Sequence, residues 1–247
     1  MIVEYHRPET LQAALELLSR KNPRTLPLGG GTRLSHYHGD PIAVVDLRKL
    51  ALGKIERTDN FLKIGAMATL QELEDFEETP QAFKETVRFE SNYNLRQAAT
   101  AAGSLVSGDG KSAFVSALLA LDAFITLQPG ERKEAVGEWL ESRSNGKEVF
   151  LITSLMIPIE ASLKYQFVGR SPVDIPIVSV AIGAWPSGRT RIVVGGFGSH
   201  PVLVMDGADL QKAEFAIINA CSHALSGRNQ EFVQETAITL VRRLLEK

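Results

Sequence analysis

A change of pattern near residue 160 is the sequence feature that most restricts how this chain can fold. Before it, short strand-like runs alternate with amphipathic helical segments, whereas after it three strand-like runs come first and two helical segments follow. Interleaved elements and segregated elements build different architectures, and 247 residues are enough for two modest domains. We therefore predict an α+β protein with one domain over residues 1–160 and a second over residues 161–247.

The spacing of the apolar residues predicts the individual elements. Leu11, Leu15 and Leu18 recur at the spacing of one helix face, and Thr10 directly before them is a candidate helix cap. The same pattern predicts further helices around residues 69–73, 114–121, 209–225 and 230–245. Strands are predicted around residues 2–5, 25–28, 43–47, 61–66, 123–127, 149–157, 164–168, 177–185 and 189–197.

Charge, apolar runs and cysteine content exclude several classes of function. A net charge of -2 without clustered Lys and Arg argues against nucleic-acid binding, which needs a basic patch. The apolar run at residues 175–185 contains Pro and Gly and is shorter than the ~20 residues of a membrane span. Because the first residues do not resemble a secretion signal, we expect a cytoplasmic protein. Cys221 is the single cysteine, so this chain alone cannot ligate an iron–sulfur cluster, and a buried, inert thiol is expected.

A glycine-rich segment after the strand predicted at residues 25–28 is the first candidate binding site. It comprises Leu28, Gly29, Gly30, Gly31, Thr32, Arg33 and Leu34. Successive glycines permit positive φ and can turn several N–H groups toward one anion such as a pyrophosphate, while Thr32 adds a hydroxyl donor. On this reasoning a bulky side chain at Gly30 would clash at positive φ and abolish binding. The alternative is a tight turn that only requires glycine, and the segment matches neither the G-x-G-x-x-G fingerprint nor a Walker loop.

A stretch of small residues over positions 98–110 is the second candidate. Small side chains are expected to leave the backbone exposed, and Thr100, Ser104 and Ser107 add neutral donors for an anion. Close packing is the alternative explanation for such a stretch. Residues 110–112 resemble the end of a Walker motif, but Leu105 stands where that motif needs glycine, so we interpret Lys111 as a solvated charge.

The order and spacing of several segments resemble the FAD-binding subunits of molybdenum hydroxylases, the family of xanthine dehydrogenase and carbon monoxide dehydrogenase flavoproteins. Residues 95–105 are similar to that family's I-R-N-x-A-T-I-G-G-N-L, residues 117–123 to its A-L-L-A-L-D-A, and residues 169–181 to its R-x-x-x-D-I-A-I-V-S-V-A. The other segments that carry the resemblance are residues 5–11, 29–34, 45–47 and 64–73.

The resemblance implies a vanillyl-alcohol-oxidase (PCMH) type fold, in which two α/β subdomains hold FAD and a small C-terminal antiparallel sheet with helices follows. It implies that residues 28–34 wrap the pyrophosphate of FAD and that Thr100, Gly103 and Ser104 contact it from the other side. Lys164 is a cofactor contact by resemblance only. The family also implies two partner chains, an iron–sulfur subunit with two [2Fe–2S] clusters and a molybdopterin-binding subunit. Electrons would pass from molybdenum through the clusters to FAD and on to an external acceptor.

Three positions depart from the family pattern. Ala102 and Ser104 replace a glycine and an asparagine, and Ala113 stands where an aspartate is expected, with Asp109 as a candidate replacement. An extra methyl at Ala102 and a missing carboxylate would both weaken contacts to the cofactor. Two alternatives therefore remain open: a subunit that has lost FAD and serves as a scaffold, and a free-standing flavin oxidoreductase on the same fold.

A few other residues could carry chemistry. His36 and His38 lack a third ligand, so we interpret them as polar surface residues and predict no metal site. Tyr165 and Phe167 either shield a flavin ring or pack in the core. Asp174 is expected to brace a turn.

Overall fold

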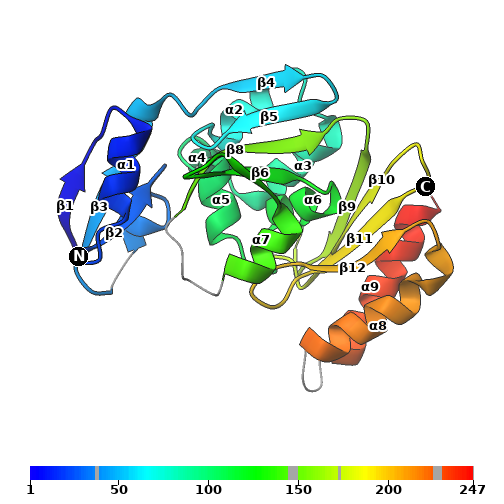
Figure 1. Cartoon of the computed structure of the whole chain (residues 1–247). Coiled ribbons are helices and arrows are strands. Elements are labelled where there is room, and N and C mark those ends of the chain that lie inside the picture. The colour runs from blue at the N-terminus through cyan, green and yellow to red at the C-terminus, as the bar shows by residue number, and fades with distance from the viewer. Residues whose placement is uncertain (37–38, 144–149, 172–173, 225–229, 247) are drawn as a thin grey trace.

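A computed structural model describes residues 1–36, 39–143, 150–171, 174–224 and 230–246 of the chain. Figure 1 shows the described elements arranged around three sheets that follow one another from the N-terminus to the C-terminus. The first sheet is parallel, and the second and third are antiparallel. The α+β class predicted from the sequence is confirmed.

The N-terminal sheet has the order β1-β3-β2 and is covered by helix α1. Its members are β1 (Ile2–His6), α1 (Leu11–Leu18), β2 (Arg24–Leu28) and β3 (Ile42–Asp46). The central strand β3 is apolar and fully buried, as expected for a parallel strand covered on both faces. Thr10 caps α1 as predicted, because its side chain accepts a hydrogen bond from the N–H of Ala13 at 3.2 Å. The glycine-rich segment follows β2 directly and lies at the carboxyl end of this sheet.

The second sheet has the order β4-β5-β8-β6-β7 and is surrounded by short helices. Its strands are β4 (Ile55–Thr58), β5 (Phe61–Gly65), β6 (Phe124–Gln128), β7 (Arg132–Ala135) and β8 (Leu151–Pro158). The helices are α2 (Leu70–Asp75), α3 (Gln81–Glu90), α4 (Tyr93–Arg96), α5 (Ala101–Ser107), α6 (Ala113–Ala120) and α7 (Val136–Ser142). Every residue of α6 is buried, which fits a helix that is apolar on all sides.

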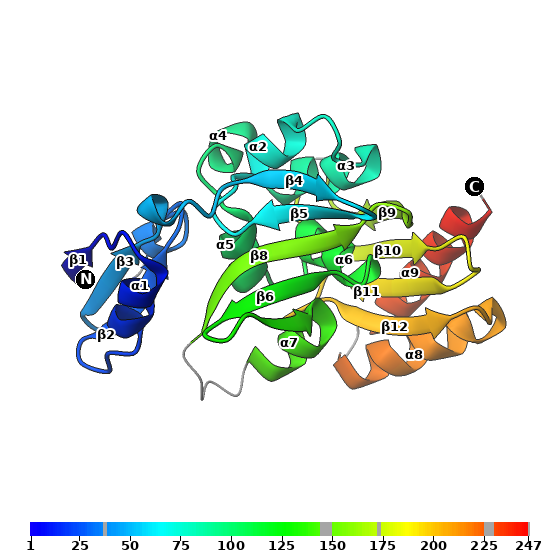
Figure 2. The same ribbon diagram turned by 45° about the horizontal axis from the view of Figure 1, so that its top comes forward.

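The C-terminal sheet has the order β12-β11-β10-β9 and carries two antiparallel helices on its outer face (Figure 2). These elements are β9 (Ser162–Val168), β10 (Val178–Ala184), β11 (Thr190–Gly195), β12 (Val202–Gly207), α8 (Ala213–Ala224) and α9 (Gln230–Leu245). Val180 and Ile192 pack toward the two helices, whereas Ala181 and Val193 on the opposite face join the core around α6. The inner face of this sheet therefore shares one hydrophobic core with the preceding part of the chain.

The predicted domain boundary at residue 160 falls between β8 and β9 and stays a prediction, because that core continues across it. The stretch 98–110, which was expected to expose its backbone, instead contains helix α5, so this prediction was wrong. Elements that the sequence analysis missed are α3, α4, α7, β4, β7 and β12. Strand β7 has the composition of an edge strand, with Arg132, Lys133 and Glu134 in succession, and therefore lacks the apolar alternation used to find strands. Among the described helices, none combines the length and apolarity that crossing a bilayer requires.

Candidate functional site

The glycine loop, residues 29–33, presents a row of backbone N–H groups without protein acceptors. Within the described part of the chain, none of these N–H groups donates a hydrogen bond to another residue. The loop is held through its carbonyl groups instead, because Ser35 donates from its N–H to the oxygen of Gly31 at 3.0 Å and from its hydroxyl to the oxygen of Thr32 at 3.4 Å. Successive free N–H groups in such a turn form a concave site for an anion.

The glycine loop lies directly on the segment that leads into α5. A Cβ atom added at Gly30 would stand 1.6 Å from the carbonyl oxygen of Ala98, and one added at Gly29 would stand 2.7 Å from Oγ1 of Thr100. A side chain at Gly30 would require the backbone to move, and one at Gly29 would require the side chain of Thr100 to shift. The two segments singled out in the sequence are therefore brought together, as the pyrophosphate prediction requires.

Gly30 does not have the positive φ predicted for it. Positive φ in this loop occurs at Gly31, with φ of 73°. Gly30 is required by its close approach to Ala98 and not by its own backbone conformation.

The first turn of α5 differs from the exposed backbone predicted for it. Its N–H groups all have protein acceptors: Ala101 donates to Ala68 O at 2.8 Å, Ala102 to Ala66 O at 3.1 Å, Gly103 to Thr100 Oγ1 at 3.2 Å and Ser104 to Thr100 O at 2.8 Å. A ligand placed here can therefore be contacted by side chains and by the bare surface of Gly103, but not by free N–H groups of this turn. Contacts from Thr100, Gly103 and Ser104 to a cofactor stay predictions.

The fold accommodates Ala102, one of the three departures from the family pattern. Ala102 packs against the core cluster, so its methyl group is accommodated by the protein. Gly103 is exposed on the same turn and keeps the outer surface of α5 flat beside Thr100. The hydroxyl of Ser104 makes no hydrogen bond to a described residue, and Ser104 is almost fully buried.

A carboxylate that the sequence analysis missed stands at the N-terminus of α6. Ala113, the position expected to hold an aspartate, begins this helix. Oε2 of Glu90, at the end of α3, accepts hydrogen bonds from the hydroxyl of Ser112 at 2.7 Å and from the N–H of Phe114 at 3.0 Å. Burial raises the pKa of Glu90, the charge of Asp109 raises it further, and these hydrogen bonds and the charge of Arg33 act in the opposite direction. The N-terminus of α6 therefore has a carboxyl group beside it, but Glu90 of α3 supplies it instead of residue 113.

Asp109 lies in a loop that is fixed to the C-terminal sheet. Its Oδ1 accepts a hydrogen bond from the N–H of Lys111 at 2.9 Å, and Lys111 is exposed as expected. The neighbouring Gly110 donates to Gly198 O at 3.1 Å and accepts from the N–H of Gly196 at 2.6 Å. This second glycine-rich segment, residues 195–198, was visible in the sequence but was not singled out. The role of Asp109 toward a cofactor stays a prediction.

An aromatic cluster joins α3 to the first strand of the C-terminal sheet. The ring of Phe89 lies 5.8 Å from that of Tyr165 and 5.2 Å from that of Phe167, measured between centroids. Burial raises the pKa of Tyr165, an interaction with Ser179 acts in the opposite direction, and Phe89 remains 47% exposed. The cluster is therefore partly core and partly surface, and shielding of a ring by Tyr165 and Phe167 stays a prediction.

The remaining candidates are placed as follows. Lys164 donates from Nζ to the carbonyl oxygen of Leu244 at 2.7 Å, so its ammonium already stabilises the C-terminal end of α9, and its role as a cofactor contact stays a prediction. Asp174 braces a turn as expected, because its N–H donates to Ser171 O at 3.1 Å and its Oδ1 accepts from the N–H of Ile175 at 2.8 Å. Cys221 is fully buried as expected, and burial raises the pKa of its thiol to about 11, which disfavours the reactive thiolate.

The histidines give no support to a metal centre. His36 lies in a short 3-10 helix after the glycine loop, and His38 is outside the described residues. Across the described ranges, no group of His, Cys, Asp or Glu side chains is arranged to hold a metal ion.

The donor set of the glycine loop fits the diphosphate of FAD. Free N–H groups, the unpaired hydroxyl of Thr32 and the positive charge of Arg33 occur on consecutive residues. A side chain at Gly30 would force this loop away from Ala98, in the segment that leads into α5. Diphosphates are commonly bound by such backbone arrangements at the end of a strand.

Comparison with known proteins gives consistent matches. A family model described as the FAD binding domain in molybdopterin dehydrogenase matches residues 1–160. The uncharacterized protein YgfM of Escherichia coli is 26% identical over 210 residues, which cover 83% of this chain and 79% of YgfM.

Solved structures resemble the chain over nearly its whole length. Quinoline 2-oxidoreductase from Pseudomonas putida 86 matches with a TM-score of 0.79 and 19% identity, over 97% of this chain and 94% of that chain. Reconstituted CO dehydrogenase from Oligotropha carboxidovorans matches with a TM-score of 0.79 and 22% identity, over 97% and 95% of the two chains. At these identities the likeness shows the fold, and it confirms the PCMH-type architecture with a C-terminal antiparallel sheet and helices.

Proposed function

This chain belongs to the family of FAD-binding domains in molybdopterin dehydrogenases, and from this premise we propose that it binds FAD non-covalently with the diphosphate between the glycine loop and residues 100–104. The observation that carries the proposal is the row of unpartnered N–H groups in the glycine loop, packed against Ala98 and Thr100 without room for a side chain. Gly29, Gly31 and Thr32 are half-buried, and a diphosphate would supply several acceptor oxygens to their N–H groups at once.

The residues of this chain have distinct roles in the proposal. Leu28 and Leu34 flank the glycine loop, whose N–H groups, with Thr32 and Arg33, hold the diphosphate. Gly103 and Ser104 bound the other side, and Asp109 lies near enough to the buried Glu90 for its charge to act on that carboxyl group. The bound FAD supplies reversible electron transfer, while the protein places and shields it.

We further propose that the chain is the flavin subunit of an oxidoreductase complex with an iron–sulfur subunit and a molybdopterin-binding subunit. A single cysteine cannot ligate a cluster, so electrons must arrive from a partner chain before they pass to an external acceptor. The solved relatives named above are a quinoline 2-oxidoreductase and a CO dehydrogenase, which supports an oxidoreductase.

A scaffold subunit without FAD is the second candidate. The observation in its favour is that the first turn of α5 has no free N–H group, so one wall of the proposed site contributes fewer donors than the sequence suggested. A free-standing flavin oxidoreductase has no comparable support.

Flavin titration of the purified chain tests the proposal. We expect the protein to show the visible flavin bands, or to bind added FAD in calorimetry after the cofactor has been removed. Riboflavin is the matched control because it has the same ring system and no diphosphate, and we expect it to bind at least about a hundredfold more weakly, since several charge-assisted hydrogen bonds are lost. A colourless protein that does not bind FAD would favour the scaffold.

A further inference from the structure

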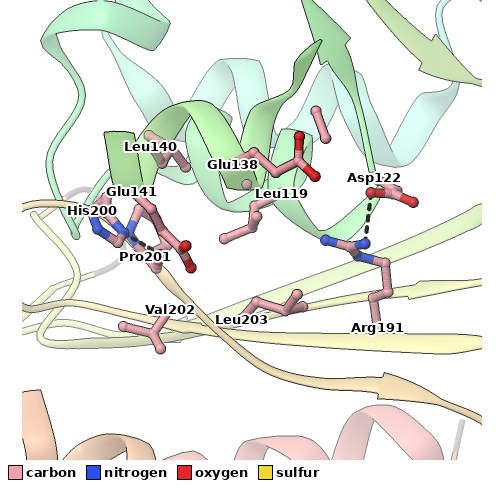
Figure 3. Close-up of a pocket in the computed structure, with 12 residues that line it drawn as sticks. Leu119, Asp122, Glu138, Leu140, Glu141, Arg191, His200, Pro201, Val202 and Leu203 are labelled. Atoms are coloured by element: carbon pink, nitrogen blue, oxygen red, sulfur yellow. Dashed lines mark hydrogen bonds and ion pairs between the residues drawn. The ribbon is translucent and has the colours of Figure 1, made fainter. Parts of the chain in front are cut away.

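A cavity of about 300 Å³ separates helix α7 from the C-terminal sheet. One wall comes from α6, α7 and the turn after α6, and the other from β11, β12 and the residues before β12, as Figure 3 shows. None of its lining residues belongs to the glycine loop or to α5. Its size lies at the lower end of the range for small-molecule sites. The middle of the cavity is apolar and is lined by Leu119, Leu140, Pro201, Val202 and Leu203.

Arg191 is a buried cation that faces this cavity with part of its guanidinium unsatisfied. The residue is 5% exposed, and its Nη1 donates to Asp122 Oδ1 at 2.6 Å and to Asp206 Oδ2 at 2.9 Å. Its Nε is buried without an acceptor, and no described residue accepts a hydrogen bond from its Nη2. A Cβ added at Gly137 would stand 4.0 Å from Nη2, so Nη2 lies beside the first turn of α7 at the edge of the cavity. An oxygen acceptor placed there would relieve the cost of the unmet donors.

The carboxylates around the cavity favour a ligand that carries positive charge. Arg191 and its neighbour Arg189 are balanced by Asp122 and Asp206, which each pair with both arginines. Glu138 and Glu141 on α7 also line the cavity, and neither pairs with any described residue. The lining therefore carries an excess of negative charge, which repels a simple anion and attracts protonated amines.

Arg191 and the unpaired carboxylate of Glu141 lie at opposite ends of the apolar middle of the cavity. In Figure 3, Arg191 and Asp122 lie at one end, Glu141 and His200 at the other, and Glu138 between them. A ligand that satisfies all of them needs an oxygen acceptor at one end, a protonated amine at the other and an aliphatic stem in between.

We propose that this cavity is a binding site for a free basic amino acid of the lysine type. Its carboxylate accepts hydrogen bonds from Nη2 of Arg191, its α-ammonium lies beside Glu138, and its side-chain ammonium reaches Glu141. The aliphatic stem covers Leu119 and Leu203. The proposal does not depend on FAD binding, because the cavity shares no residue with the glycine loop.

Three probes test the chemistry by calorimetry on the full-length chain: L-lysine, L-norleucine, which lacks the side-chain ammonium, and 1,5-diaminopentane, which lacks the carboxylate. We expect L-lysine to bind with a dissociation constant of about 1 mM or tighter, as a ligand of this size allows. Each of the other two probes loses one charge-assisted contact and is expected to bind at least about tenfold more weakly. Lysine capped by amides at both ends distinguishes a lysine side chain of another protein from the free amino acid.

Two variants place the binding in this cavity. Glu141→Gln removes the carboxylate at one end, and Gly137→Leu extends a side chain from α7 toward Arg191, where the nearest neighbour is the flexible end of Leu119 at 3.2 Å from the added Cβ. Both are expected to weaken lysine binding at least about tenfold. Glu77→Gln is the matched control, because Glu77 is exposed and does not line the cavity. Circular dichroism checks that each variant is folded.

The proposal is overturned if L-lysine does not bind, if norleucine or diaminopentane binds as tightly, or if only the capped lysine binds. Lysine binding that survives both cavity variants would also overturn it, since the site would then lie elsewhere.

Discussion

At the scale of single residues, Gly30 is a position in the glycine loop where one added carbon atom cannot be accommodated. A methyl group there meets the carbonyl oxygen of Ala98 at 1.6 Å, so the glycine loop must move away from α5. We expect Gly30→Ala to weaken FAD binding at least about tenfold while the chain stays folded, because only the cradle is opened. Gly53→Ala is the matched control, since its added Cβ has ordinary contacts at 4.0 Å. FAD titration of both variants is the measurement, and unchanged affinity in Gly30→Ala would mean that the loop is a turn and not a binding site.

Residue-level predictions from the sequence succeeded where the reason was local. The cap at Thr10 and the hydrogen bond from Ile175 to Asp174 depend on neighbours a few residues away, whereas glycine at position 30 is required by Ala98, far along the chain. Glu90 could not be found in this way, because its hydrogen bonds reach residues more than twenty positions further along the chain. The surroundings of Nη2 of Arg191 likewise depend on Gly137, more than fifty positions earlier in the chain.

At the scale of elements, helix α6 contacts both the second sheet and the C-terminal sheet and so joins them in one core. It is buried along its whole length, with the second sheet's core on one side and strands β10 and β11 on the other. We expect Leu118→Ala to lower the free energy of unfolding by about 3 kcal/mol, because it leaves a cavity in a fully buried layer. Val106→Ala on α5 is the control, since Val106 is 53% exposed and its loss should change stability by less than about 0.5 kcal/mol. Urea unfolding measures both, and equal effects would contradict the central role of α6.

Elements with a regular apolar period were predictable, and those shaped by their surroundings were not. Helix α9 was predicted to its exact bounds because its apolar stripe recurs at the helical period. Helix α5 was mistaken for exposed backbone, because the N–H groups of Ala101 and Ala102 are occupied by the carbonyl groups of Ala68 and Ala66, which are distant in the sequence. Strand β7 was missed because its charged residues lack the apolar alternation by which strands are recognised.

At the scale of the whole molecule, the shared core predicts that the parts of the chain before and after residue 160 do not fold independently. Leu163, Ala181 and Val193 from the C-terminal sheet belong to the same core cluster as α6. We expect a fragment of residues 1–160 to expose that face of α6, to bind a hydrophobic dye and to unfold without a cooperative transition, whereas the full chain unfolds cooperatively. Thermal unfolding with dye fluorescence compares them, and a fragment as stable as the full chain would show that the domain boundary is also a folding boundary.

The same shared core has a consequence for how the protein is made. A ribosome releases the residues of α6 well before β10 and β11 have been synthesised, so the nascent chain carries an apolar helix whose covering sheet does not yet exist. The glycine loop and α5 can approach each other during this interval, but α6 is covered only after β10 and β11 have been synthesised. Synthesis therefore leaves a period in which the half-made protein is vulnerable to aggregation, and its length is set by the speed of translation.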